Sequence, residues 1–130
     1  MVGLFSRTLN DPQKKKNVQK LKKIRKLVKE KKYNETLASC TEYLQKVPHN
    51  HDVLFIVGGI YYMQNKYSTA ISYFDKILEI ATYDVPVLLL KAYSHQKLGE
   101  NKRAIQCCEK IREIDPKNKS VSELMGQLKS

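Results

Sequence analysis

The sequence has no run of about 18 apolar residues, the length that a helix needs to cross a bilayer. Its first ten residues lack the apolar core of a secretory signal peptide. The basic stretch at residues 14–32 is rich in Lys, whereas transit peptides are rich in Arg and Ser. We therefore expect a soluble cytoplasmic protein. Because 42% of its 130 residues are hydrophobic, the chain can form a single globular domain with a modest core.

Residues that carry chemistry are also scarce. The three cysteines have no further Cys or His at the spacing of a zinc site, and the three histidines are dispersed. Gly58 and Gly59 fall inside an expected helix, so they do not form a phosphate-binding loop. We expect His95 to be a partly buried core residue, and His49 and His51 to be exposed in a loop. The sequence thus predicts no enzyme activity, no cofactor, no metal site and no small-molecule substrate.

Acidic residues are scarce only in the first quarter of the chain. Residues 1–32 contain 12 Lys and Arg against two acidic residues, a net charge of +10 out of the total of +11. This basic helix, at residues 14–32, could bind the phosphates of nucleic acid or an anionic membrane surface, or it could simply be a solvated face. No aromatic residues lie between the lysines, so base stacking is not indicated. The candidate anion-binding residues are Lys14, Lys15, Lys16, Lys22 and Lys26.

A recurrence every 34 residues is the strongest feature that is present. Apolar and small residues from position 70 to position 80 have the spacing of a helix with one buried face. The matching triplets are Thr36, Leu37 and Cys40; Ala70, Ile71 and Phe74; and Ala104, Ile105 and Cys108. A fixed period of this length indicates stacked copies of one supersecondary unit.

Helix signals divide each copy into two helices. We expect helices at about residues 12–31, 33–46, 53–64, 67–80, 85–98, 102–114 and 120–128. Asp11, Asp52 and Asp84 are the expected caps at three of the starts. Gly99 suits the left-handed end of the fifth helix.

The pattern resembles the tetratricopeptide repeat family, whose unit is a pair of antiparallel helices. The residues that carry the resemblance are Val57, Gly58, Tyr61, Ala70 and Phe74 in the second copy, Ala92, Ala104, Cys108 and Pro116 in the third, and Tyr33, Thr36, Cys40 and Pro48 in the first. In the first copy, Lys20 and Lys23 stand where the family usually buries apolar side chains. Either that helix is rotated so that Leu21, Ile24 and Val28 face inward, or its apolar stripe serves another purpose.

The resemblance implies an all-α tetratricopeptide-like α-solenoid with three helix-turn-helix repeats and a C-terminal capping helix. The repeats would cover about residues 17–50, 51–84 and 85–118, with the capping helix at about 119–129. Together they would form a single domain over residues 11–130, after a flexible tail at residues 1–10.

The resemblance also implies a non-enzymatic scaffold or adaptor for protein interactions. The first helices of the repeats would line an apolar concave groove that holds a peptide, a partner helix, or a second copy of the chain. The tail at residues 1–10 is an alternative occupant of this groove. The expected groove residues are Leu21, Arg25, Val28, Phe55, Gly59, Tyr62, Met63, Leu89, Tyr93, Gln96 and Lys97.

One subset of the family grips the C-terminal carboxylate of chaperones with Lys, Asn and Arg. The places that match this clamp hold Leu21, Arg25, Ile56, Pro86 and Leu90, of which only Arg25 has a suitable charge. We therefore expect the clamp to be absent.

Overall fold

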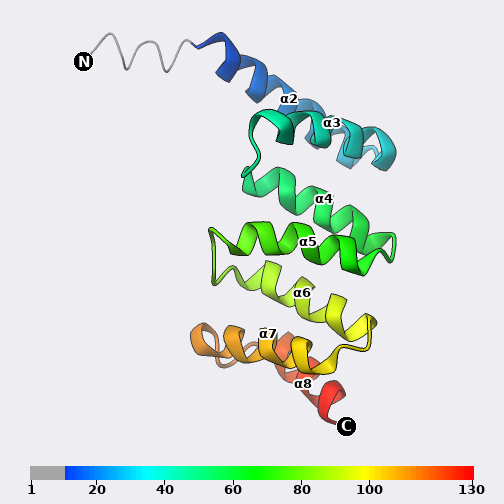
Figure 1. Cartoon of the computed structure of the whole chain (residues 1–130), viewed down its shortest axis with the longest axis vertical. Coiled ribbons are helices and arrows are strands. Elements are labelled where there is room, and N and C mark those ends of the chain that lie inside the picture. The colour runs from blue at the N-terminus through cyan, green and yellow to red at the C-terminus, as the bar shows by residue number, and fades with distance from the viewer. Residues whose placement is uncertain (1–10) are drawn as a thin grey trace, which may run out of the picture. The chain divides into compact units, whose positions relative to one another are not determined.

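The computed structural model describes residues 11–130, and within that range it has seven α-helices and no strand. The helices are α2 (Pro12–Lys29), α3 (Tyr33–Lys46), α4 (His51–Met63), α5 (Tyr67–Leu78), α6 (Val85–Lys97), α7 (Asn101–Ile114) and α8 (Lys119–Lys129) (Figure 1). The all-α class is confirmed. None of these helices is both long enough and apolar enough to span a bilayer. The tail expected at residues 1–10 lies outside the described residues.

The chain forms two compact units, of which the first ends at Val53 and the second comprises Leu54–Ser130. In the first unit α2 packs against α3, and both helices contribute fully or nearly fully buried side chains. Ile24 and Leu27 are the buried residues of α2, whereas Leu21 and Val28 are only partly buried. The buried side of α2 is therefore shifted by about one residue from the expected set of Leu21, Ile24 and Val28. Lys20 remains half-exposed, and its Nζ lies 3.3 Å from Glu42 Oε1 on α3.

Local capping signals explain most helix starts. The carboxylate of Asp11 accepts a hydrogen bond of 2.9 Å from the Gln13 N–H, and that of Asp84 accepts one of 3.1 Å from the Val87 N–H, as expected. The prediction for Asp52 is wrong. The side chain of Asn50 accepts the hydrogen bond from the Val53 N–H at 3.0 Å, and α4 begins two residues earlier than expected, at His51. Gly99 ends α6 with a φ of +76°.

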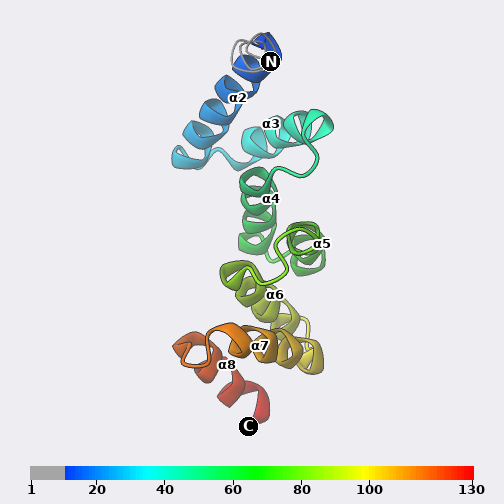
Figure 2. The ribbon, with the colours of Figure 1, turned by 90° about the vertical axis from the view of Figure 1, so that its left-hand side faces the viewer.

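The second unit is built around a core between its last three helices. Residues of α6, α7 and α8 form one buried cluster: Leu88, Ala92, Cys107, Cys108, Ile111, Val121, Leu124 and Met125. Helix α6 also packs against α5, and α8 covers α7 and α6. Figure 2 shows α4 and α6 to the left of α5, so α4 and α6 lie on the same side of the unit. The two sides of α6 consequently face different surroundings.

Candidate functional site

A group of tyrosines marks the side of the second unit that α4 and α6 share. The rings of Tyr62 on α4 and Tyr67 at the start of α5 meet edge to face, with centroids 5.5 Å apart and an interplanar angle of 76°. Burial raises the pKa of the Tyr62 phenol, and the neighbouring Tyr67 and Tyr93 raise it further. Tyr93 on α6 therefore lies within the range of electrostatic interaction with Tyr62 on α4. Three aromatic side chains thus contribute to one half-buried surface.

Other expected groove residues surround this surface without being needed in the core. Gly59 faces open space, since a β-carbon built there would have no atom within 4 Å. Met63 is 57% exposed, and Lys97 is also exposed. The amide of Gln96 donates a hydrogen bond of 2.9 Å to Gln127 Oε1 on α8. Helix α8 therefore extends this surface beyond α6.

The remaining apolar residues of the predicted groove have a second role in packing. Leu89 and Tyr93 pack against the core cluster of α6, α7 and α8. Phe55 makes a tilted ring contact with Phe74, with centroids 6.5 Å apart and an angle of 46°. Each of these three side chains is half-buried. They therefore stabilise the fold as well as contributing surface.

The other three predicted groove residues lie in the first unit. Leu21 and Val28 are half-buried next to the inward stripe of α2. Arg25 is exposed, and its Nη2 lies 3.5 Å from Asp52 Oδ2. Their membership of one groove together with the residues of α4 and α6 stays a prediction.

The sequence did not predict a role for Tyr67 or Gln127 at this surface. Tyr67 follows Tyr62 by five residues, across the short connection between α4 and α5. In this connection Asn65 has a φ of +62°, and the chain reverses its direction. Gln127 lies on the capping helix, and the spacing of the polar residues in that helix does not indicate a binding surface. Only the pairing of the helices brings these two residues to the tyrosines and to Gln96.

The candidate anion-binding lysines are all exposed on α2. Lys14, Lys15, Lys16, Lys22 and Lys26 form no ion pair with any residue in 11–130, unlike Lys20 and Arg25. Lys15, Lys22, Lys26 and Lys29 follow one another at spacings of seven, four and three residues. They therefore share one stripe of the helix, on the side away from Ile24.

The histidines divide as expected between the core and the surface. His95 is only 4% exposed, and its Nδ1 lies 3.0 Å from Glu100 Oε1. His49 and His51 are exposed. Across residues 11–130, no three His, Cys, Asp or Glu side chains come together in a way that could hold a metal ion.

A sequence model of the tetratricopeptide repeat matches residues 61–128, just over half of the chain. The chain belongs to the tetratricopeptide repeat family. The matched segment runs from the end of α4 through α8, and so contains most of the tyrosine surface. Among curated proteins, none matches this sequence significantly.

Solved structures with the same fold share little sequence with this chain. The first tetratricopeptide domain of Spaghetti (RPAP3), solved with the HSP90 peptide SRMEEVD, is 17% identical with a TM-score of 0.77, and the match covers 88% of this chain and 91% of that one. The second such domain of human RPAP3, solved with the HSP70 peptide SGPTIEEVD, is 17% identical with a TM-score of 0.76, covering 87% and 94%. A tetratricopeptide repeat protein of Parabacteroides merdae is 18% identical with a TM-score of 0.82, covering 92% and 46%.

Proposed function

We propose that this chain is a non-enzymatic scaffold for protein interactions, and that the surface formed by α4, α6 and α8 binds a peptide or a partner helix. The observation that carries the proposal is the group of Tyr62, Tyr67 and Tyr93 on that surface. Tyrosine is enriched at protein interfaces because it combines a large apolar ring with a polar end. Gly59 leaves space beside the rings, and Gln96 and Gln127 supply amide groups.

The chemistry of this surface favours an apolar or aromatic peptide over an acidic chaperone tail. Two of the neighbouring structures were solved with chaperone peptides that end in Glu-Val-Asp. The positions that would carry the carboxylate clamp here are Leu21, Arg25, Ile56, Pro86 and Leu90. The guanidinium of Arg25 already lies 3.5 Å from the carboxylate of Asp52. An acidic tail would therefore meet apolar side chains where it needs cations.

Gly59→Glu is the sharpest test of the proposed surface. The new side chain would enter open space, so the fold should be retained while a carboxylate appears beside the tyrosines. Affinity capture with mass spectrometry should show that Gly59→Glu loses the partners of the unmodified protein. Ser72→Glu on α5 is the matched control, because it adds the same charge at an exposed helix position outside α4, α6 and α8. Equal capture by both variants would rule out the proposed surface.

A second candidate function rests on α2. Its exposed lysine stripe has no carboxylate partners within the described residues, so the charges are available to an anionic partner. Lysine contacts phosphate as a point charge, and such contacts do not distinguish one nucleotide sequence from another. We propose on this ground that α2 can hold the protein on nucleic acid or on an acidic lipid surface, independently of the tyrosine surface.

A further inference from the structure

A cavity of about 410 Å³ lies between α5, α6 and α7 in the second unit. Its apolar wall includes Ile71, Leu78 and Leu88. This volume is within the range of small-molecule sites, which usually combine an apolar wall with a few convergent polar groups. The cavity is therefore large enough for a small ligand rather than for a folded segment.

The cavity uses a different side of α6 from the tyrosine surface. Leu88, Lys91 and His95 line it, at spacings of three and four residues along the helix. Leu89 directly follows Leu88, and Tyr93 lies midway between Lys91 and His95 in the sequence. Leu89 and Tyr93 therefore project from a different face of α6. Occupation of the cavity does not require occupation of the tyrosine surface.

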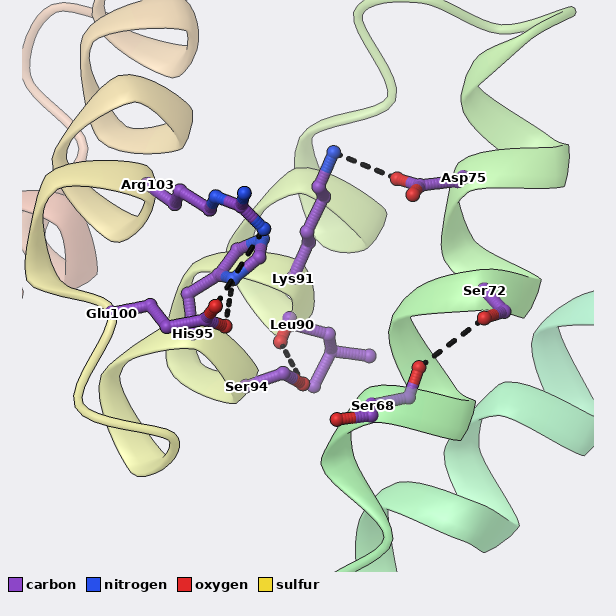
Figure 3. A network of polar contacts seen from close by, with 9 residues as sticks. All are labelled: Ser68, Ser72, Asp75, Leu90, Lys91, Ser94, His95, Glu100 and Arg103. Carbon is purple, nitrogen blue, oxygen red and sulfur yellow. Dashed lines mark hydrogen bonds and ion pairs between the residues drawn. The ribbon is translucent and has the colours of Figure 1, made fainter.

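Three cations from two helices converge on the cavity. Lys91 comes from α6, and Arg103 and Lys110 come from α7, seven residues or about two turns apart on one face of that helix. Figure 3 shows the Lys91 side chain directed toward Asp75 of α5 and the Arg103 guanidinium beside the His95 ring. Two acidic groups pair with these cations, Asp75 in the wall and Glu100 at the start of α7.

The acidic groups compensate the three cations unequally. Lys91 Nζ lies 2.7 Å from Asp75 Oδ1 and is fully paired. Arg103 Nη1 lies 3.6 Å from Glu100 Oε2, too long for a good hydrogen bond. Lys110 Nζ lies 5.1 Å from the centre of the Tyr83 ring and forms no ion pair with a described residue. Lys110 is therefore the cation of this wall that has no ion-pair partner among the described residues.

A further carboxylate lies near this side of the cavity, because Glu113 accepts a hydrogen bond of 2.9 Å from the hydroxyl of Tyr83, the ring that Lys110 contacts. Nδ1 of His95 lies 3.0 Å from the Glu100 carboxylate, which can only accept, so Nδ1 carries a proton and donates. The two oxygens of Glu100 therefore contact different partners, Oε1 the His95 ring and Oε2 Arg103. Burial raises the pKa of the Cys107 thiol in the wall, so this group stays neutral at physiological pH.

We propose that this cavity binds a small organic oxyanion, a carboxylate or a phosphate ester carried on a short apolar chain. The oxyanion would lie between Arg103 and Lys110, where the guanidinium fork can donate two hydrogen bonds and the ammonium adds a point charge. The apolar chain would pack against Ile71, Leu78 and Leu88. This ligand would bind without chemical change, since the cavity supplies charge and shape but no nucleophile that is ionised at neutral pH.

The test is an NMR titration of the full chain with hexanoate and with hexyl phosphate. We expect saturable shifts at the backbone amides of residues 103–110 with at least one of the two, and a comparison of their affinities identifies the preferred oxyanion. Hexanol has the same chain without the charge and should bind at least about tenfold more weakly. Absence of saturation with both anions, or equal binding of hexanol, would overturn the proposal.

Charge-neutralising variants locate the ligand. Arg103→Gln and Lys110→Gln should each weaken binding by about tenfold or more, because each removes one charged donor from the anion. Arg112→Gln is the matched control, as it removes a charge from an exposed residue of α7 that does not line the cavity. Equal weakening by the control would mean that net charge, and not the cavity, accounts for the binding.

Discussion

Gly58 and Phe74 are complementary partners across the pair of helices α4 and α5. A β-carbon built on Gly58 would lie only 2.6 Å from Cε1 of Phe74, far inside van der Waals contact. Phe74 is fully buried, so its rigid ring has no free space into which it could turn. The absence of a side chain at position 58 is therefore what allows the two helices to pack this closely.

Gly58→Ala should destabilise the protein by about 1–3 kcal/mol, because the added methyl group forces the Phe74 ring or the α4 backbone to shift. Gly59→Ala is the matched control, since its β-carbon would meet no atom within 4 Å. The control should be neutral or more stable by about 0.5–1 kcal/mol, the usual gain of Ala over Gly inside a helix. Urea unfolding of the three proteins measures both effects. Similar stability of the two variants would show that α4 and α5 do not approach this closely.

The buried thiols predict a loss of stability at alkaline pH. Burial raises the pKa of Cys40 to about 11, above the usual value of 9.0. Because the folded-state pKa is raised, the thiol stabilises the fold fully below about pH 9, and this contribution is lost as the pH rises toward about 11. The free-energy difference between the unmodified protein and Cys40→Ala should shrink over this range, as measured by urea unfolding at several pH values.

Comparison with Cys40→Ala removes the pH dependence that both proteins share, including that of Lys and Tyr side chains. Cys108, whose pKa burial also raises to about 11, offers an independent repeat in the second unit. A free-energy difference that stays constant from pH 9 to about 11 would contradict the buried environment of the thiol.

The lysine stripe of α2 predicts strongly salt-dependent binding. Affinity for single-stranded DNA or for vesicles containing phosphatidylserine should fall by about tenfold or more between about 50 and 200 mM salt, if several phosphates are engaged. Replacing Lys14, Lys15, Lys16, Lys22 and Lys26 with Gln should abolish this binding and leave the fold intact, because these side chains are exposed and Gln is a good helix former. Fluorescence anisotropy and vesicle sedimentation measure the two forms of binding.

A charge-matched variant separates α2 from the net charge of the chain. Replacing five other exposed lysines with Gln, namely Lys46, Lys102, Lys117, Lys119 and Lys129, removes the same charge from outside α2. This variant should retain most of the binding. A protein that binds neither probe even at low salt would leave α2 as a solvated face.

The sequence by itself determined the class of the fold and most helix ends. The 34-residue recurrence predicted paired helices, and the family is now shown by the match at residues 61–128. Asp11, Asp84 and Gly99 mark helix ends as expected, because capping and left-handed turns depend on a few neighbouring residues.

Only the tertiary structure decided how each helix is rotated and which side chains meet. The inward stripe of α2 contains Leu27 rather than Leu21. The cavity with Arg103 and Lys110 was not foreseen, since its walls come from three helices. A helical period gives the width of an apolar stripe but not its direction to within one residue. That direction, and every contact between distant positions, depends on how the neighbouring helices pack.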